Sequence, residues 1–510
     1  MDDRDPHAPG EALPHLVLLR LSGDIGTKAR ATHARFVTRL VRNVRDALRA
    51  EGLRHRVTVT RNRILVETDR PDAAAALARV HGLQSVSLAV REPATSLEAV
   101  VAAGVRLFAE RVRGRRFAVR AKVVGDRRSA RLGSRDVEHA LGAALLPFSA
   151  GVNLDAPDVT AFVELCEGEA FFFPERIGAP GGLPLGVEGR AVALVSGGFD
   201  SAVAAWLLLK RGVALDYVFC NLGGAIHERG VLRVMKVIAD RWSYGTSPRL
   251  HAVDFQPLAE ELQAKTQPRY WQVLLKRQML RAAEAVARTP RAGGRAGSAI
   301  VTGEALGQVS SQTLGNLAAI STATALPILR PLLGLNKDEI LPIAKRIGTH
   351  DLSAVVGEYC ALVPTRPTTD AHADVVAAEE AKLDPSLLAR AVAARRVIDL
   401  RACDPEGGAI PGLELDSIPE GAVVIDLRSR AAFAGWHWPE AVQLDFAHAL
   451  AAAPKLPSDR RYVVYCEFGL KSADLAERLR KLGIEAAHVR GGLKRVLALA
   501  RARGVATPEL

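Results

Sequence analysis

Cysteine is scarce in this 510-residue chain and widely spaced, at Cys166, Cys220, Cys360, Cys403 and Cys466. No pair has the spacing of a zinc site, and so few cysteines in so long a chain exclude a disulfide-stabilised fold. Long apolar runs are also missing, since none approaches the roughly 18 residues that a membrane helix needs. The opening segment, MDDRDPHAPGEALPH, lacks the charged and then apolar pattern of a secretion signal. We therefore expect a cytoplasmic protein without a membrane partner, in which a reactive thiol can stay free.

Acidic residues are the minority among the charged ones, with 56 Asp and Glu against 68 Lys and Arg and a net charge of +12. The basic excess is concentrated in one stretch, where only Glu110 and Asp126 oppose it. A solvated helix face would account for part of this stretch. The whole set indicates a surface that follows a polyanion, because each cation set against a phosphate releases counterions. Its members are Arg106, Arg111, Arg113, Arg115, Arg116, Arg120, Lys122, Arg127, Arg128, Arg131 and Arg135.

The order of strand and helix patterns predicts several domains, three or four for a chain of this length. The first segment alternates strands and helices and suits a small α+β layer. A second unit begins near Ser96 and ends before a Gly/Pro-rich linker at 178–189. Buried strands alternate with helices from 191 to about 351, which predicts a parallel sheet with helices on both faces. A fourth unit, beginning near Gly412, alternates again.

The segment SGGFDS, Ser196 to Ser201, joins an apolar strand at 191–195 to a helix. Gly197 and Gly198 would let backbone N–H groups approach an anion, and a helix N-terminus favours negative charge. Asp200 would repel phosphate unless a cation lay between them, so we assign it to Mg²⁺. There is no GxxxxGK[ST] motif, which disfavours a kinase or a GTPase.

A second reactive loop lies near the C-terminus, where the strand 462–465 is followed by CEFGLKS and then by a helix. Cys466 would face backbone N–H groups and the helix N-terminus at the mouth of this loop. Both features favour a thiolate and spread the charge of a persulfide. The alternative is a small buried thiol at a strand end. Cys166 and Cys220 fit that description, since they lie in apolar strand patterns, and Cys403 has no evident role.

SGGFDS resembles the PP-loop of the ATP pyrophosphatases, which cleave ATP to AMP and pyrophosphate while adenylating an acceptor. The loop leaves the acceptor open, because amide-forming synthetases and tRNA-modifying enzymes share it. Three further motifs are similar to the tRNA 4-thiouridine synthetase family: NLGG (221–224), VTGEALGQVSSQT (301–313) and RPL (330–332) with Lys337. The second of these follows a strand, at the sheet edge where such folds bind ligands.

The resemblance implies an ATP site with Asp200 as a catalytic residue. Lys276 is by itself an ordinary exposed helix lysine, but it occupies the position of a nucleotide-contacting lysine in the family. Lys337, beside Arg330, would stabilise charge on the transferring phosphoryl group. The ATP-contacting residues that we expect are Leu194, Val195, Ser196, Gly197, Gly198, Phe199, Ser201, Lys276, Gly303, Gln312 and Lys337.

The C-terminal motifs resemble a rhodanese domain with Cys466 as the sulfur carrier. Many rhodaneses have arginine after the cysteine and Trp after the closing glycines, whereas this chain has Glu467 and no such Trp. Because Glu467 opposes a small anionic donor such as thiosulfate, we expect a protein persulfide, from a cysteine desulfurase, to load Cys466. Cys360 matches the partner cysteine of the family, so the resemblance implies a transient disulfide between Cys360 and Cys466.

The N-terminal residues Gly26-Thr27-Lys28, Phe36 and Asn43-Val44 resemble the ferredoxin-like domain of the same family. We therefore expect a multidomain α/β protein. Its parts are a ferredoxin-like α+β domain (1–71), a THUMP RNA-binding domain (72–176), a doubly wound, parallel-sheet PP-loop domain (177–400) and an α/β rhodanese domain (408–510). The residues that we expect to contact RNA are Arg111, Arg113, Arg115, Arg116, Arg120, Lys122, Arg127 and Arg128.

The activity implied is that of a tRNA sulfurtransferase using ATP and Mg²⁺. A uridine, which the family places at position eight of tRNA, would be adenylated at O4, and sulfur carried on Cys466 would replace that oxygen. Adenylation is needed because a carbonyl oxygen is a poor leaving group. In the family the rhodanese domain can also supply sulfur for the thiazole of thiamine, which implies a sulfur carrier protein of the thiamine pathway as a further partner. Two rivals are a sulfur relay that uses Cys466 alone and an RNA-binding module with relic catalytic domains; the intact SGGFDS and the cysteines oppose them.

Overall fold

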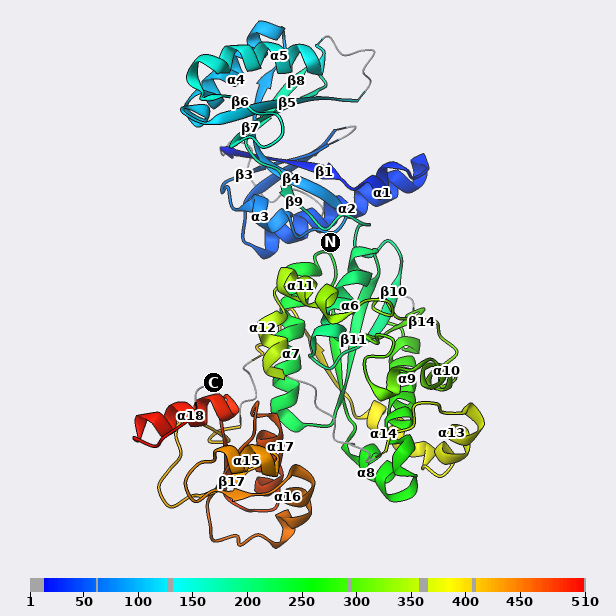
Figure 1. Cartoon of the computed structure of the whole chain (residues 1–510). Helices are drawn as coiled ribbons and strands as arrows, with labels where there is room; N and C mark the ends of the chain where they lie inside the picture. Colours follow the sequence, from blue (N-terminus) through cyan, green and yellow to red (C-terminus); the bar gives the residue numbers. More distant parts are fainter. Residues whose placement is uncertain are drawn as a thin grey trace. The chain divides into compact units, whose positions relative to one another are not determined.

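The computed structural model describes residues 13–60, 63–125, 132–291, 296–356, 366–405 and 410–508. The chain divides into two compact units (Figure 1). The first is Met1–Glu188 with two short segments, Leu209–Val213 and Arg241–Thr246. The second consists of Gly189–Leu208, Ala214–Asp240 and Ser247–Leu510. Within the described residues, every helix is too short or too polar to cross a membrane.

The first unit is built on one nine-stranded sheet in the order β2-β3-β1-β4-β8-β7-β5-β6, with β9 pairing to β4. The strands are β1 (His15–Leu21), β2 (His55–Val59), β3 (Ile64–Thr68), β4 (Leu83–Pro93), β5 (Arg116–Val124), β6 (Gly151–Val152), β7 (Val159–Cys166), β8 (Glu169–Phe173) and β9 (Ile177–Gly178). The helices are α1 (Gly23–Gly26), α2 (Arg30–Ala50), α3 (Ala73–Leu77), α4 (Leu97–Val112) and α5 (Ser134–Leu145).

Strand β4 joins the two halves of this sheet. Its first part pairs antiparallel with β1, Leu16 opposite Ala89, and its last residues pair with β8, Val90 opposite Phe172. An ion-pair cluster crosses the same junction, because Glu164 of β7 is 1% exposed and lies 2.6 Å from Arg20 of β1. Arg63, before β3, lies 2.8 Å from the other carboxylate oxygen. The two halves are therefore covalently and electrostatically continuous.

The N-terminal core extends past the boundary that we expect at residue 71. Ala74 and Leu77 of α3 and Val86 of β4 pack in one cluster with Phe36 of α2. The Gly/Pro-rich segment after residue 176 packs there too, because Leu183 is buried in the same cluster. The Gly and Pro content of this segment predicts its turns, but it does not predict the surface on which the segment packs. The domain division at residue 71 therefore stays a prediction.

The second unit contains a six-stranded sheet in the order β14-β13-β10-β11-β12-β15, parallel except for β15, which is antiparallel to β12. Its strands are β10 (Arg190–Leu194), β11 (Ala214–Asn221), β12 (Arg249–Asp254), β13 (Ile300–Val301), β14 (Ile328–Leu329) and β15 (Arg396–Asp399). The helices are α6 (Phe199–Lys210), α7 (Gly224–Trp242), α8 (Gln256–Lys265), α9 (Trp271–Arg288), α10 (Leu314–Ser321), α11 (Lys337–Ile347), α12 (His350–Val356), α13 (Ala373–Glu380) and α14 (Pro385–Ala393).

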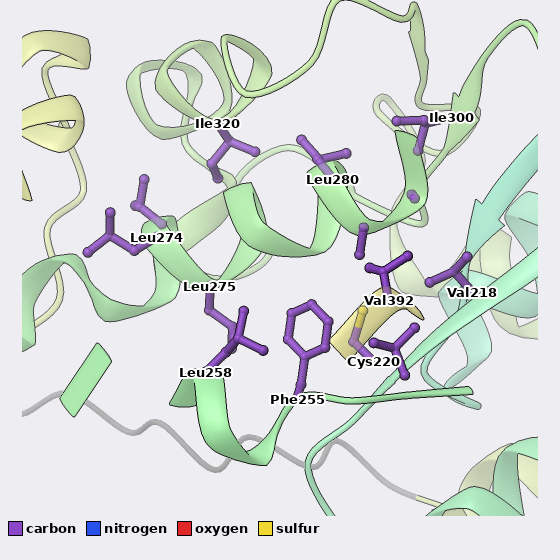
Figure 2. Packing of buried hydrophobic residues seen from close by; sticks show 14 of the residues in the cluster. Val218, Cys220, Phe255, Leu258, Leu274, Leu275, Leu280, Ile300, Ile320 and Val392 are labelled. Atoms are coloured by element: carbon purple, nitrogen blue, oxygen red, sulfur yellow. The ribbon is translucent and has the colours of Figure 1, made fainter. Parts of the chain in front are cut away.

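Helices cover both faces of this sheet, with α7 and α9 on opposite sides of β11 in Figure 1. One face packs Val218 and Cys220 of β11 against α8 and α9. Figure 2 shows Phe255 and Leu275 in this apolar cluster, next to Cys220. Strands buried on both faces explain the nearly continuous apolar runs of the sequence. The expected doubly wound parallel sheet is confirmed.

The second unit also contains a five-stranded parallel sheet in the order β16-β20-β19-β17-β18. Its strands are β16 (Glu414–Leu415), β17 (Val423–Asp426), β18 (Val442–Gln443), β19 (Tyr462–Tyr465) and β20 (Ala486–Val489). Its helices are α15 (Arg430–Gly435), α16 (Phe446–Ala452), α17 (Leu470–Lys481) and α18 (Gly492–Ala502). The central strand β19 ends directly before Cys466, so this cysteine lies at the carboxyl edge of the sheet.

Candidate active site and sulfur-carrier loop

The SGGFDS segment forms a closed turn between β10 and α6. Ser201 Oγ accepts a hydrogen bond from the Ser196 N–H at 3.3 Å and donates to the Gly198 carbonyl at 3.1 Å. Gly197 has a φ of +79°, and a Cβ there would lie 2.9 Å from Cγ1 of Val356. Glycine is therefore required by backbone conformation and by space. The result is a preformed turn at a helix N-terminus, the arrangement that binds phosphate.

A cavity of about 670 Å³ opens beside this turn. Its wall includes apolar side chains from β11 and α9, such as Phe219 and Met279, and it also includes lysines and carboxylates. The cavity therefore has a surface suited to an apolar ring and another suited to charged groups. The residues of our expected set that line it are Leu194, Val195, Ser196, Gly198, Phe199, Asp200, Ser201, Lys276, Gly303, Gln312 and Lys337. Gly197 lies in the turn but is not part of the wall.

Asp200, in the first turn of α6, contacts two polar side chains of the cavity. Lys337 Nζ, at the start of α11, donates to the Asp200 carboxylate, and Gln308 Nε2 donates to Asp200 Oδ2 at 2.8 Å. The backbone at Asp200 is also close to Gly303, where an added Cβ would lie 2.8 Å from the Asp200 carbonyl carbon. The turn and the loop after β13 are therefore pressed together, which fixes Asp200 relative to the second motif.

Glu304 was not among the residues expected from sequence, yet it lines the cavity and is 8% exposed. Its carboxylate accepts hydrogen bonds from Lys276 Nζ at 3.0 Å and from Arg330 Nε at 2.8 Å. The available signal was its place between two glycines of TGEALG, directly after an apolar strand. A carboxylate in such a turn is aimed at the ligand edge of the sheet.

His227 of α7 was also missed by sequence reasoning. It lines the cavity, its Nε2 lies 3.4 Å from the Ser196 carbonyl oxygen, and its ring meets Phe219 edge-on at 4.9 Å between centroids. Burial lowers the pKa of His227 to about 4, so the ring is neutral at physiological pH. The signal was a His-Glu pair three residues after NLGG, on an otherwise amphipathic helix.

Cys466 lies in a tight loop between β19 and α17 and is 6% exposed. The Gly469 N–H donates to its Sγ at 3.1 Å, and Ser472 Oγ lies 3.5 Å from the same atom. Gly469 itself has a φ of +94°. Gly492 packs against this loop so closely that a Cβ there would lie 2.6 Å from the Glu467 carbonyl oxygen. Donors directed at sulfur at a helix N-terminus stabilise a negative charge there.

The carrier loop also reaches the cavity within the second unit. Phe468, two residues after Cys466, is 62% exposed and lines the cavity. Nearby, the Ala225 N–H in the first turn of α7 donates to Glu477 of α17 at 2.8 Å. Arg229, one turn further along α7, lies 2.7 Å from Glu414 of β16. These contacts hold the sulfur-carrier loop beside the cavity wall.

Comparison with known proteins places this geometry in a family. Residues 186–384 match the family described as thiamine biosynthesis protein (ThiI), residues 16–87 the ThiI ferredoxin-like domain, and residues 414–499 the rhodanese-like domain. The tRNA sulfurtransferase of Pyrobaculum aerophilum is 38% identical over 479 residues, which cover 93% of this chain and 96% of that protein. The chain belongs to the tRNA sulfurtransferase family.

Other members and a solved structure agree. The tRNA sulfurtransferase of Thermoplasma acidophilum is 37% identical over 472 residues, covering 92% of this chain and 94% of that protein. The crystal structure of a 4-thiouridine synthetase–RNA complex with bound ATP is similar with a TM-score of 0.63 and 30% identity, over 75% of this chain and 99% of that one. The expected multidomain α/β class and the resemblance stated from the motifs are both confirmed.

The remaining cysteines of this tRNA sulfurtransferase family member differ from Cys466 in their surroundings. Cys166 and Cys220 are buried, and burial raises the pKa of both thiols. Cys403 is half-buried, and its Sγ lies 3.5 Å from the Leu400 carbonyl oxygen. Cys360, expected to be the partner of Cys466, lies outside the described residues.

The expected RNA-contacting residues lie on exposed parts of the first unit. Arg116, Arg120 and Lys122 are exposed residues of one face of β5, on which Ala118 is buried, while Phe117 and Val119 of the same strand enter the core. Arg111 and Arg113 lie at the end of α4 and Arg115 in the turn that follows, all exposed. Arg113 is paired with Glu110, and its Nε lies 3.0 Å from that carboxylate. Arg127 and Arg128 lie outside the described residues.

Proposed function

We propose that the chain is an ATP-dependent tRNA sulfurtransferase that adenylates O4 of a tRNA uridine, at position eight, and replaces that oxygen with sulfur from Cys466. The observation that carries this proposal is the shared cavity, which is lined by the SGGFDS turn and by Phe468 of the sulfur-carrier loop. An activating site and a sulfur carrier would then act on one uridine without release of the adenylate. The family match supports the reaction, and the similar 4-thiouridine synthetase, solved with RNA and ATP, supports both substrates.

The lining of the cavity suits both the ring and the phosphates of ATP. The apolar wall, including Phe219 and Leu280, would take the adenine ring, and the N–H groups of the Ser196–Ser201 turn would take the phosphates. Lys276 and Lys337 are the lysines that line the cavity. They would stabilise charge as pyrophosphate leaves.

The carboxylates fit a Mg²⁺ ion that arrives with the nucleotide. Mg²⁺ commonly takes one or two carboxylates together with phosphate oxygens and water. Asp200 is the carboxylate at the turn, and the described residues contain no cluster of three or more His, Cys, Asp or Glu that could hold an ion without the nucleotide. When bound, the ion would offset phosphate charge. Asp200 would hold it, while Gln308 and Lys337 orient that carboxylate.

The chemistry proceeds through two leaving groups. Uridine O4 attacks the α-phosphate of ATP, and pyrophosphate leaves with the electron pair of the broken P–O bond. The terminal sulfur of the Cys466 persulfide, or sulfide released from it, then attacks C4, and AMP leaves with the C–O pair. The thiolate of Cys360 attacks the Cys466 sulfur, the bond between that sulfur and the transferred sulfur breaks, and the transferred sulfur leaves with the electron pair, either on C4 or as sulfide that then attacks C4. The product is a Cys360–Cys466 disulfide, and an external two-electron reductant restores both thiols.

The donor and the RNA surface complete the proposal. A cysteine desulfurase would load Cys466 as a protein persulfide, because Glu467 beside the thiol repels small anionic donors. The exposed cations at the end of α4, in the turn after it and on β5 would track the tRNA backbone and position the substrate without reading its bases. The described members of that surface are Arg111, Arg113, Arg115, Arg116, Arg120 and Lys122.

A second function is favoured by the family description as a thiamine biosynthesis protein. In that role Cys466 would pass its sulfur to a carrier protein of the thiamine pathway without using the ATP site. The Asp200→Ala variant separates the two functions, because it removes the carboxylate at the SGGFDS turn and leaves the sulfur-carrier loop intact. Transfer to the carrier by this variant would support the second function, and its loss would oppose it.

The decisive experiment is mass spectrometry of tRNA nucleosides after incubation with the protein, ATP, Mg²⁺, a cysteine desulfurase and cysteine. We expect 4-thiouridine with one AMP formed for each sulfur inserted. Sulfur loading of Cys466 without any 4-thiouridine would support the relay alternative. RNA binding without AMP formation or loading would support the alternative of relic catalytic domains.

A further inference from the structure

Glu304 joins two cations from different elements, of which Lys276 lines the cavity. Lys276 comes from the middle of α9 and lies 3.0 Å from Oε1, while Arg330 follows β14 and lies 2.8 Å from Oε2. Thr302 Oγ1 donates to Oε2 at 3.1 Å. Arg330 is held a second time, by its Nη2 donating to Ser321 Oγ at 3.0 Å. Each oxygen of one buried carboxylate therefore fixes one cation.

The charge state of this cluster is set by its position. Burial by itself would raise the pKa of Glu304, but the positive charge of Lys276 and the hydrogen bond from Arg330 lower it. The side chain is therefore a carboxylate at neutral pH. With one negative and two positive groups, the cluster keeps a surplus positive charge at the edge of the cavity.

The cluster is also fixed relative to the phosphate-binding turn. Gly303, the residue before Glu304, packs so closely on Asp200 and Ser201 that a Cβ would lie 2.8 Å from the Ser201 nitrogen. Movement of the Glu304 backbone would therefore require movement of the turn. A lysine at the end of a flexible four-carbon stem gains most from such an anchor, because its position is otherwise spread over many rotamers.

We propose that Glu304 is a positioning residue that holds Lys276 and Arg330 aligned, before ATP binds, for the charge that develops on the departing pyrophosphate. This inference rests on the proposed adenylating function and names a residue that serves it. Charges that are already in place need no reorganisation as the P–O bond breaks, and catalysis draws on that difference. Glu304 itself contacts no reacting atom in this scheme and acts through the two cations.

The alternative is that Glu304 merely neutralises buried cations, and the chain offers a matched control for it. Glu380 accepts from Arg277 at 2.8 Å and from Arg281 at 2.7 Å, so it also joins two cations of α9. Arg277 is adjacent to Lys276 in sequence, but neither Glu380 nor Arg277 lines the cavity. Glu304→Gln and Glu380→Gln thus each remove one carboxylate that pairs with a cation of α9, the first inside the proposed site and the second outside it.

The test measures AMP formation with tRNA and ATP, together with the thermal midpoint of each variant. For Glu304→Gln we expect kcat to fall about tenfold, less than the roughly 100- to 1000-fold lost with a direct transition-state donor because Glu304 acts through other side chains, with a smaller change in KM for ATP. Glu304→Asp should recover part of kcat. Glu380→Gln should keep kcat and KM within about twofold while showing a similar shift of the midpoint. Equal loss of kcat in Glu304→Gln and Glu380→Gln, or no loss in Glu304→Gln, would overturn the inference.

A double-mutant cycle separates the effect of Glu304 on Lys276 from a general effect of the substitution on folding. If Glu304 acts in part through Lys276, the loss of kcat in the Glu304→Gln/Lys276→Gln double variant should be smaller than the product of the two single losses, whereas independent roles would multiply them. Should Glu304→Gln not fold, Thr302→Val removes one hydrogen bond to the carboxylate and should lower kcat by a few-fold, again with a smaller effect in Lys276→Gln. Multiplying losses overturn the inference. Wild-type protein that forms no AMP would instead overturn the proposed function itself.

Discussion

Lys337 Nζ lies 2.8 Å from each of the two carboxylate oxygens of Asp200. The lysine begins α11 and the aspartate lies in the first turn of α6, so the contact joins two elements across the cavity. Lys337 is 41% exposed and Asp200 17% exposed, so the lysine can exchange partners with a ligand while the carboxylate stays in place. This pair is the point from which the nucleotide site can be tested.

Replacing Asp200 by Ala should abolish ATP-dependent formation of 4-thiouridine, because the carboxylate that would hold Mg²⁺ is lost. Loading of Cys466 by a cysteine desulfurase should be unchanged. Nucleoside mass spectrometry measures the first, and mass spectrometry of the intact protein measures the second. Asp254→Asn is the control, since Asp254 is an exposed residue at the end of β12. Wild-type thiolation by Asp200→Ala would contradict the magnesium assignment.

Replacing Arg116, Arg120 and Lys122 together by Gln should weaken tRNA binding and flatten its dependence on salt. Each lost phosphate contact lowers the slope of log K against log salt concentration by about 0.7 to 0.9, so the triple variant should lose about 2 to 3. Filter binding across a salt series measures this slope. An unchanged slope would mean that RNA binds to a different surface of the protein. The control is a triple variant in which Lys265, Arg288 and Arg461 are replaced by Gln. These three exposed cations of the second unit each pair with an acidic residue.

Replacing each of the two thiols of the proposed relay should block a different step of sulfur transfer. Cys466→Ala should end all sulfur transfer, because its loop supplies the Gly469 N–H that would stabilise a persulfide. Cys360→Ala should still accept sulfur on Cys466 and form AMP, yet stop after about one turnover when persulfide is the only sulfur source. Dithiothreitol or free sulfide should partly restore it by replacing the second thiol. Many turnovers by Cys360→Ala without a reductant would show that the disulfide step is wrong.

Replacing Phe468 by Ala should slow the transfer of sulfur to adenylated tRNA while leaving Cys466 loading and AMP formation near wild-type values. The reason is that Phe468 is the side chain of the sulfur-carrier loop that lines the nucleotide cavity. Single-turnover thiolation with preloaded protein measures this step. Leu482→Ala, another exposed apolar residue of the same domain, is the control. Equal transfer rates in the two variants would mean that Phe468 does not seat the loop.

Replacing Tyr465 by Phe should lower stability without lowering sulfur loading. Tyr465 is fully buried, donates from its hydroxyl to Asp426 Oδ2 at 2.6 Å and accepts from the Trp438 N–H at 3.1 Å. Loss of that hydroxyl leaves a buried donor unpaired, which costs about 1 to 3 kcal/mol. Denaturant unfolding followed by the loading assay checks both parts. A large fall in loading with unchanged stability would assign Tyr465 to the chemistry instead.

The phosphate-binding turn and the sulfur-carrier loop could be predicted from sequence because each is a continuous segment. Each segment contains a strand, a glycine turn and the start of a helix within a dozen or so residues. Local sterics then fix the conformation of the turn, and the helix N-terminus supplies the N–H groups that bind an anion. Glu304 could not be assigned in this way. Its partners are 28 and 26 residues away in the chain, and nothing in the pattern of Lys276 or Arg330 indicates that they meet at one carboxylate.

The limits of the N-terminal core could not be predicted for a similar reason. Strand β4 reads as one alternating segment, and alternation reports which face is buried but not which neighbour pairs with each half. The Gly/Pro-rich segment predicted as a linker does contain turns, since Gly181, Gly182 and Gly186 have φ values of +70°, +69° and +93°. Its packing through Leu183 depends on the fold of a distant segment.

The strand shared by the two halves of the first sheet limits how the protein can be dissected. A fragment that begins at residue 72 would lose β1, and β4 would then present its backbone from Leu83 to Ala89 as a bare edge open to pairing with other chains. The same cut would take Arg20 and Arg63 from Glu164 and leave a buried carboxylate beside Arg176 alone. Such a fragment should aggregate, and any failure to bind RNA would report on its solubility. A piece meant to isolate RNA capture must therefore start ahead of His15 and carry the whole sheet.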